Sequence, residues 1–190
     1  MRDASLAPEK RVEVAMAKFG RLSSSEVVTV ALEMITALGA DAITSQTKIL
    51  DIASKQGEFT RAFIALHGIE VGHNVYALPT STVSYEFTRK VYSLLGLDTS
   101  HVFSDFTTYD LLNPDKKATL MEQLKDMNFD LVIGNPPYQQ ADGGARASAK
   151  PIYHEFVAAT NTITDTLSSV LMPARWFTGE RGLMSLERIC

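Results

Sequence analysis

Cysteine is nearly missing from this sequence, because Cys190 is the only one among its 190 residues. No disulfide can therefore form within the chain, which fits a reducing compartment, and we expect a cytoplasmic protein. Long apolar runs are also missing, since none approaches the ~18 residues that a transmembrane helix needs. Residues 1–5 lack the apolar core of a secretory signal. We therefore expect no membrane association.

Positive charge is in short supply as well. The chain has 18 Lys and Arg residues against 22 Asp and Glu residues, which gives a net charge of −4. Binding to nucleic acid phosphates needs a cationic surface. This composition therefore disfavours a protein that binds nucleic acid through these residues alone. The four histidines show no i, i+4 pairing and no neighbouring cysteine, and the sequence predicts no metal site.

From residue 47 onwards, short apolar runs alternate with stretches of helical spacing. The predicted strands lie at 47–53, 74–80, 100–106, 129–135 and 167–173. The predicted helices between them lie at 58–66, 82–95, 116–126 and 152–161. Near-continuous apolar strands separated by helices are typical of a parallel sheet that is covered on both faces. The sequence therefore predicts an α/β fold with a doubly wound, mostly parallel sheet.

Two helices are predicted ahead of the first strand. Apolar residues at helical spacing predict a short amphipathic helix within residues 1–22. Ser23 and Glu26 have the spacing of a capping box at the start of a second helix, and Gly39 is typical of its end. We therefore divide the chain into an N-terminal helical segment, 1–22, and one domain, 23–190.

The turn after the first predicted strand is the first candidate site. Asp51 is expected at the end of that strand, and Gly57 opens the helix that follows. In an open parallel sheet, ligands gather at the carboxyl ends of the strands. A turn that contains glycine lets the backbone approach such a ligand. Taken by itself, the same pattern is equally typical of a plain tight turn.

Two consecutive prolines follow Asn135 in the segment DLVIGNPPYQQ, residues 130–140. Pro136 and Pro137 fix the backbone and withhold two N–H donors, so the Pro136 carbonyl can face outward as an acceptor. The Asn135 amide oxygen offers a second acceptor, and Tyr138 offers an aromatic face. These groups suit a flat molecule that carries an exocyclic amine. A rigid loop that merely ends a strand would explain the prolines but not Asn135 and Tyr138.

The polar stretch QQADGGARASAK, residues 139–150, follows this motif directly. Its Gly, Ala and Ser content, without apolar periodicity, predicts a mobile loop. Arg146 and Lys150 within it are equally consistent with phosphate contacts and with solvated side chains.

With Asn-Pro-Pro-Tyr after the fourth predicted strand, the sequence resembles the AdoMet-dependent N6-adenine DNA methyltransferases of restriction-modification systems, particularly those fused to or associated with a restriction endonuclease. The other segments that resemble this family, in chain order, are FGRLSSSEVV, ILDIASKQGEF and SSVLMPARWF. The resemblance runs from about Phe19 to the C-terminus. It implies a Rossmann-like fold and a catalytic motif made of Asn135, Pro136, Pro137 and Tyr138. Asn135 and the Pro136 carbonyl would bind the target nitrogen of a flipped adenine, and Tyr138 would stack on its ring.

The resemblance also implies that S-adenosyl-L-methionine (AdoMet) is the cofactor. The residues that would bind it are Asp51, Ala53, Gly57, Phe59, Asp105, Phe106 and Asn135. Asp105, expected at the end of the third strand, would accept from the amino group of the cofactor's adenine, and Phe106 would pack on that ring. A turn or helix-capping aspartate is the alternative for Asp105.

The sequence departs from the family's pattern at two places and in its length. Lys55 and Gln56 stand where the glycine-rich turn usually has Gly and Ser, so we expect the backbone there to approach AdoMet less closely. Pro79 and Thr80 stand where an acidic residue usually holds the ribose hydroxyls. The family's last strands and its DNA-recognition region would lie after Cys190.

Three functions are compatible with these residues. The first is transfer of a methyl group from AdoMet to the N6 amine of an adenine that is flipped out of DNA. The second is methylation of another nucleic acid or of a protein glutamine, because glutamine methyltransferases that act on release factors share Asn-Pro-Pro-Tyr. The third is a cofactor-binding module without turnover of its own.

The expected partner is DNA, bound mainly through regions outside these residues because the chain is acidic. The predicted strand at 167–173 would leave an exposed sheet edge. Such edges pair with another copy or are covered by a loop. We therefore expect this chain to self-associate or to bind DNA poorly.

Overall fold

The computed structural model of the chain describes residues 25–39, 43–138 and 151–171. The helix predicted within residues 1–22 and the loop predicted at 139–150 therefore lie outside the described residues. No helix in the described part of the chain is both long and apolar enough to cross a membrane.

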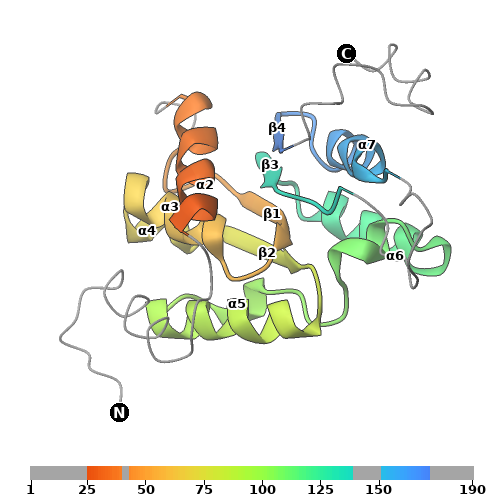
Figure 1. Cartoon of the computed structure of the whole chain (residues 1–190), viewed down its shortest axis with the longest axis horizontal. Coiled ribbons are helices and arrows are strands. Elements are labelled where there is room, and N and C mark those ends of the chain that lie inside the picture. The colour runs from red at the N-terminus through yellow and green to blue at the C-terminus, as the bar shows by residue number, and fades with distance from the viewer. Residues whose placement is uncertain (1–24, 40–42, 139–150, 172–190) are drawn as a thin grey trace.

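The described strands form one four-stranded sheet in which every neighbouring pair is parallel. They are β1 (Ile49–Ser54), β2 (Val75–Pro79), β3 (Leu131–Gly134) and β4 (Leu167–Val170). Their order across the sheet is β2-β1-β3-β4, so β1 and β3 lie side by side in its middle (Figure 1). The carboxyl ends of these two strands consequently meet at the same end of the sheet, where the predicted site lies.

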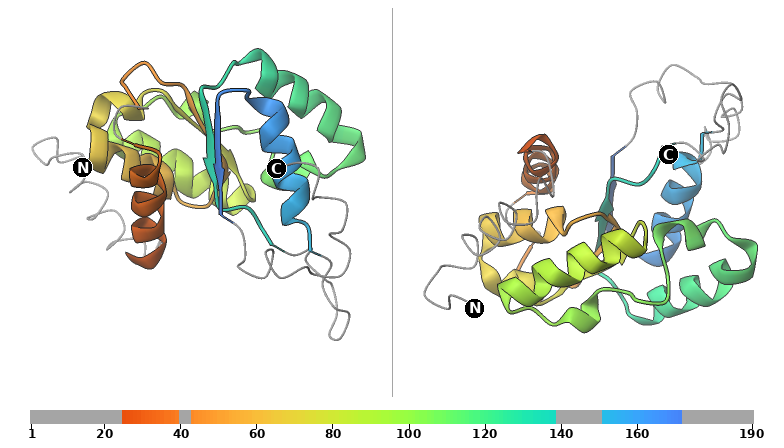
Figure 2. Two further views of the ribbon diagram at one scale, coloured as in Figure 1. Left: turned by 90° about the horizontal axis from the view of Figure 1, so that it is seen from above. Right: turned by 60° about the horizontal axis from the view of Figure 1, so that its bottom comes forward.

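Helices cover both faces of this sheet. The described helices are α2 (Ser25–Ala37), α3 (Glu58–His67), α4 (Ile69–Gly72), α5 (Thr82–Leu95), α6 (Pro114–Asp126) and α7 (Tyr153–Ile163), with 3₁₀ turns η2 (Thr99–His101) and η3 (Thr108–Leu111). The first four helices pack on one face, and α6 and α7 pack on the other. Figure 2 shows the strands between these two layers. The predicted doubly wound α/β fold is confirmed.

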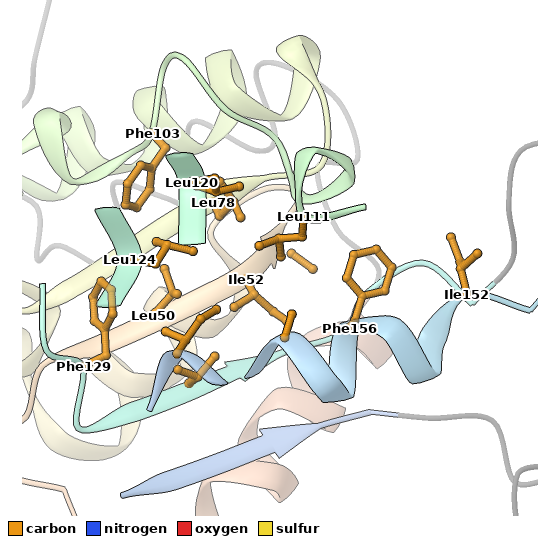
Figure 3. Close-up of a cluster of buried hydrophobic side chains, with 14 residues drawn as sticks. Leu50, Ile52, Leu78, Phe103, Leu111, Leu120, Leu124, Phe129, Ile152 and Phe156 are labelled. Carbon is orange, nitrogen blue, oxygen red and sulfur yellow. The ribbon is translucent and has the colours of Figure 1, made fainter. Parts of the chain in front are cut away.

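β1 contributes to the hydrophobic core on both faces, because successive side chains of a strand point in opposite directions. Leu50 and Ile52 are fully buried in the core beneath α6 and α7, together with Phe156 (Figure 3). Ile49 is fully buried on the opposite face, in the same cluster as Phe63 of α3. Burial on both faces explains the near-continuous apolar run of β1. A carboxylate within that run, Asp51, is therefore unusual.

The strand predicted at 100–106 is wrong. Its first two residues lie in the turn η2 instead, and the Asp98 carboxylate accepts a hydrogen bond at 2.9 Å from the second N–H of that turn. Val102 then pairs with Ala77 of β2 through one isolated parallel bridge. The aspartate side chain offers the backbone an alternative to the sheet at the start of this segment. The apolar spacing of the segment did not reveal that competition.

The sequence predicts that Asp51 ends its strand. In the structure β1 continues beyond it to Ser54. Between these two residues the register of β1 against β2 shifts by one residue. Beside the shift, the buried Thr108 hydroxyl donates to the Ile52 carbonyl at 2.8 Å. Thr108 thus reaches across from η3 to a β1 carbonyl at the carboxyl end of the sheet.

We expect Thr108→Val to lower the free energy of unfolding by about 1–3 kcal/mol, although valine has nearly the same shape. The variant leaves the buried Ile52 carbonyl without its hydroxyl donor, and urea unfolding followed by circular dichroism would measure the loss. Thr162→Val is the matched control, because the Thr162 hydroxyl also bonds to a backbone carbonyl but is exposed on α7. We expect the control to change stability by no more than about 0.5 kcal/mol. Equal losses in the two variants would contradict this role of Thr108.

Candidate functional site

The Asn-Pro-Pro-Tyr motif begins directly after β3, at the carboxyl end of the sheet. Gly134, the last residue of β3, lies so close to β1 that a Cβ atom there would be 3.0 Å from Ile52 Cγ1. Pro136 is buried, and the other three residues of the motif are partly exposed. The motif is therefore held against the sheet by its first proline while its polar groups reach the surface.

Backbone hydrogen bonds hold this loop at both ends. The Leu171 N–H donates to the Gly134 carbonyl at 3.0 Å, and the Ile152 N–H donates to the Tyr138 carbonyl at 3.0 Å. Within the loop, the Tyr138 hydroxyl donates to Asn135 Oδ1 at 2.9 Å. The acceptor and the aromatic ring that the sequence predicts for a flat amine are thus hydrogen-bonded to each other. Burial raises the pKa of Tyr138 above 10.0, so its hydroxyl remains a donor at neutral pH.

The turn after β1 is built around acceptors from its own chain. The Gly57 N–H donates to Ser54 Oγ at 3.2 Å. The N–H groups of Lys55 and Gln56 both donate to Glu58 Oε2, at 3.2 Å and 2.7 Å. Glu58 is the first residue of α3 and is only 4% exposed. Three successive backbone N–H groups of the turn are therefore occupied by side chains within the protein.

Gly57 gives this turn a backbone conformation that other residues rarely adopt. Its φ angle is +67°, in the left-handed region that favours glycine. A Cβ atom at this position would also lie 3.3 Å from Val91 Cγ1 of α5. Conformation and space therefore both call for glycine at this predicted cofactor position.

Asp51 is a fully buried carboxylate beside the turn. Its Oδ1 accepts from the Ala53 N–H at 3.1 Å, whereas its Oδ2 is buried and has no partner among the described residues. Burial raises the pKa of Asp51 well above 3.8, and the nearby charge of Glu58 raises it further. The hydrogen bond from the Ala53 N–H and the nearby Ser54 hydroxyl only partly oppose these effects. The ionised form of Asp51 is therefore unfavourable in the folded protein.

We expect Asp51→Asn to raise the free energy of unfolding, by about 1–3 kcal/mol at pH 8, because it removes a buried charge that lacks a partner. The folded state binds the Asp51 proton more tightly than the unfolded chain does. The stabilising contribution of this carboxyl is therefore full below its unfolded pKa of about 3.8. It is lost as the pH rises through the higher pKa of the folded state.

The test is the difference in unfolding free energy between Asp51→Asn and the natural chain, measured by urea unfolding from pH 4 to pH 9. We expect this difference to grow with pH, because asparagine does not titrate. Asp98→Asn serves as the control, since hydrogen bonds from Ser100 lower the pKa of that exposed carboxyl. For Asp98 the stability difference should have the opposite sign. A difference for Asp51→Asn that does not vary with pH would refute the predicted titration.

The two predicted motifs lie on neighbouring strands and reach the same end of the sheet. Asp51 pairs with Ile133 across the β1–β3 ladder. Ala53 lies two residues further along β1, and Asn135 lies two residues after Ile133, directly after the end of β3. The register therefore brings the turn after β1 next to the loop after β3, at the carboxyl end of the sheet.

The other predicted cofactor residues lie in different surroundings. Phe59 is buried in the core beneath α2 and α3. Asp105 is exposed, and its Oδ1 accepts from the Ser104 hydroxyl at 3.2 Å. Phe106 packs partly buried against the core beneath α6 and α7.

Asp105 and Phe106 also line a groove of about 430 Å³, together with residues of α5 such as Tyr85 and Arg89. A second groove, of about 460 Å³, lies between α6 and α7. Asp51 lines neither of these two grooves. Neither groove therefore brings Asp51 and Asp105 together in a single pocket. Within the described ranges, no cluster of three or more His, Cys, Asp or Glu residues could hold a metal ion.

The buried acceptors beside the turn fit the cationic part of AdoMet. Asp51 Oδ2 and Gln56 Oε1 are both buried without a partner in the described part of the chain. A buried acceptor without a donor costs free energy unless a ligand supplies the donor. AdoMet carries an α-ammonium group close to its positively charged sulfonium. Asp51 and Gln56 are therefore the residues that would hold this end of the cofactor.

The sequence did not identify Glu58 as part of the site. The only signal for it in the sequence is its spacing. Glu58 is the first residue of α3 and follows the turn residues Lys55 and Gln56 by three and two positions. An acidic residue there favours the helix N-terminus and can accept from free backbone N–H groups. Spacing alone does not reveal that this carboxylate is buried.

A four-stranded, all-parallel sheet between two helical layers, with Asn-Pro-Pro-Tyr after a central strand, is consistent with a Rossmann-like methyltransferase fold. The match to a known family covers most of the chain. The chain belongs to the Eco57I restriction-modification methylase family, whose model matches residues 45–189. The methyltransferase family expected from the sequence is thereby confirmed.

One curated relative matches a short part of the chain. It is a protein of Mycoplasma pneumoniae (strain ATCC 29342 / M129) described as an uncharacterized adenine-specific methylase. The two sequences are 36% identical over 52 residues, which are 26% of this chain and 12% of the relative. The chain thus matches only a small fraction of the length of that protein.

Proposed function

We propose that this chain carries the methyl-transfer site of an adenine-specific restriction-modification methylase. In this proposal, a methyl group passes from AdoMet to the exocyclic N6 amine of an adenine flipped out of DNA. The observation that carries the proposal is the pairing of the Asn135 amide oxygen with Tyr138 at the end of β3, beside the turn after β1. Family membership and the adenine-specific description of the short relative support it.

The target nitrogen of adenine is a poor nucleophile, because its lone pair is delocalised into the ring. AdoMet, when bound, supplies a methyl group that is activated by the adjacent sulfonium charge. Asn135 Oδ1 accepts from the amine and favours a tetrahedral nitrogen, whose lone pair is then no longer delocalised and points out of the plane of the ring. The bond between sulfur and the methyl carbon would break as the bond to nitrogen forms, and the positively charged methylated nitrogen would then lose its extra proton to water. This catalysis depends on positioning and electrostatics, so no strong general base is needed.

The bond between Tyr138 and Asn135 is compatible with this role. An amide oxygen has two lone pairs, so Asn135 Oδ1 can accept from the adenine amine while it still accepts from the Tyr138 hydroxyl. The same bond limits the freedom of the Tyr138 ring. A ring that is already oriented can stack on a flipped base and offset part of the unstacking cost of a few kcal/mol.

The acidic composition supports the inference that most phosphate contacts come from regions outside this chain. The net charge is −4, whereas nucleic acid binding draws on Lys and Arg contacts. We also infer that the edge strand β4 offers a surface for self-association, because its outer side has no neighbouring strand in the described sheet. Light scattering would test this inference, and a strictly monomeric chain that binds duplex DNA tightly would contradict it.

The test of the proposed function uses the chain with AdoMet that carries a radiolabelled methyl group. Short single-stranded oligonucleotides at high concentration avoid the need for a separate DNA-binding region and for base flipping from a duplex. We expect label in N6-methyladenine after digestion to nucleosides, and none with an oligonucleotide that lacks adenine. Label on a glutamine-containing peptide instead of the oligonucleotide would favour a protein methyltransferase and contradict the proposal.

A further inference from the structure

The carboxylate of Glu58 occupies the backbone N–H groups that an anionic ligand would otherwise use at the turn after β1. Successive N–H groups in a turn form a concave anion-binding site. Here those of Lys55 and Gln56 both donate to Glu58 Oε2, and the N–H of Gly57 donates to Ser54 Oγ. Glu58 is almost completely buried, so water does not compete strongly for its carboxylate. These three N–H groups are therefore already hydrogen-bonded within the protein and are not available to a ligand.

Two acceptor oxygens beside the same turn receive no hydrogen bond from the described residues. Asp51 Oδ2 and Gln56 Oε1 are buried and have no partner in the described part of the chain. Asp51 also lies close enough to Glu58 for the two carboxylates to interact electrostatically. A ligand carboxylate at this place would find the N–H groups of Lys55, Gln56 and Gly57 already occupied and would lie beside the Glu58 carboxylate, whereas the cation near Asp51, the Lys55 side chain, is exposed. A ligand ammonium would find two acceptors, and its positive charge would favour the ionised form of Asp51.

We propose that Glu58 is a specificity-determining residue that closes the turn to carboxylates, so that the turn recognises the amino acid part of the methyl donor through its ammonium group alone. This inference rests on the proposed function, because it takes AdoMet as the ligand. It goes beyond that function in assigning selectivity to a residue outside the Asn-Pro-Pro-Tyr motif. Its consequence is that the α-carboxylate of AdoMet contributes little to binding.

Decarboxylated AdoMet tests this directly, because it keeps the ammonium and the sulfonium and lacks only the carboxylate. Calorimetric titration would give the dissociation constants of both compounds for the natural chain. We expect the two affinities to agree within about threefold, or decarboxylated AdoMet to bind more tightly. AdoMet binding more than tenfold tighter than its decarboxylated analogue would overturn the inference while leaving the proposed function intact. Absence of binding by both compounds, to the natural chain and to every variant below, would contradict the proposed function and the inference with it.

Variants of Glu58 separate the hydrogen-bonding role from its charge. Glu58→Ala frees the N–H groups of Lys55 and Gln56, so we expect the preference for AdoMet over the decarboxylated compound to increase about tenfold. Glu58→Gln keeps an oxygen that can accept from both groups, so its preference should stay within about threefold of the natural chain. An equal gain in both variants would mean that the charge of Glu58 alone sets the preference, and no gain in either variant would mean that Glu58 does not set it; each result would overturn the inference.

Two controls keep these measurements interpretable. Glu70→Ala removes an exposed glutamate from the first turn of α4, so it should leave both affinities unchanged. Thermal unfolding shows whether Glu58→Ala remains folded at the titration temperature. Glu58→Gln, which preserves the acceptor, provides the second reading if the alanine variant does not fold. A gain in preference for AdoMet in the folded glutamine variant would then contradict the inference by itself.

Discussion

Asn135→Ala is expected to lower the rate of methyl transfer by about 10²- to 10³-fold, the usual cost of removing one well-placed electrostatic contact to the reacting group. The amide oxygen of Asn135 is the acceptor that the proposed mechanism places on the target amine. Asn135 follows β3 and is only partly buried, so we expect the variant to fold normally. Single-turnover transfer of radiolabelled methyl groups to an adenine-containing oligonucleotide would measure the rate.

Tyr138→Phe is the matched control for this variant. Asn135→Ala removes both the acceptor and its hydrogen bond with the Tyr138 hydroxyl, whereas Tyr138→Phe removes the hydrogen bond alone. Phenylalanine also retains the aromatic face for stacking. We therefore expect Tyr138→Phe to keep the rate within about tenfold of the natural chain, given that one neutral hydrogen bond contributes about 0.5–1.5 kcal/mol. Equal, large losses in both variants would show that loop order matters more than the acceptor.

The parts of the fold that local signals determine were predictable from the sequence. Helix α5 has the predicted bounds, Thr82–Leu95. The Ser81 side chain caps its first turn by accepting from the Ser84 N–H at 3.1 Å, so the start of the helix is fixed by residues that are neighbours in sequence. The Asn-Pro-Pro-Tyr motif was predictable for the same reason. Its acceptor, rigid backbone and ring are contributed by four consecutive residues.

Features that depend on contacts between distant segments were not predictable. The segment at 100–106 has the apolar spacing of a strand, yet the cap by Asp98 turns its start into η2. The continuation of β1 past Asp51 depends on its pairing with β2 and on Thr108, which lies 56 residues away from Ile52 in the chain. Neither contact leaves a periodic signal in the sequence.

In the predicted cofactor site, some features follow from local sequence signals and others from contacts between distant segments. Gly57 is evident as a turn residue, and its left-handed φ angle and the nearby Val91 side chain account for it. Phe59 belongs to the same sequence segment as Gly57, but its side chain lies in the core because the first turn of α3 packs against the sheet. A contiguous motif thus identifies the segment that forms a site. Tertiary packing decides which of its side chains line that site.

Phe156→Ala is expected to give the largest loss of stability among the variants discussed, about 3–5 kcal/mol, the usual cost of truncating a fully buried phenylalanine. Phe156 is 0% exposed and points from α7 toward Ile52 and Leu111 (Figure 3). A loss of this size is a large part of the 5–15 kcal/mol that stabilises a typical domain. Urea unfolding would measure it. Val157→Ala, a change at the partly exposed neighbouring position, should cost no more than about 1 kcal/mol.

The effect of Phe156→Ala should extend to the Asn-Pro-Pro-Tyr loop. The Ile152 N–H, directly before α7, donates to the Tyr138 carbonyl at 3.0 Å, and Ile152 is buried in the same core as Phe156. Loosening α7 therefore weakens one of the two backbone bonds that hold the loop. We expect amide hydrogen exchange at Ile152 to accelerate in Phe156→Ala and to remain slow in Val157→Ala. Unchanged exchange at Ile152 in a destabilised Phe156→Ala protein would show that the bond between Ile152 and Tyr138 does not depend on the packing of α7.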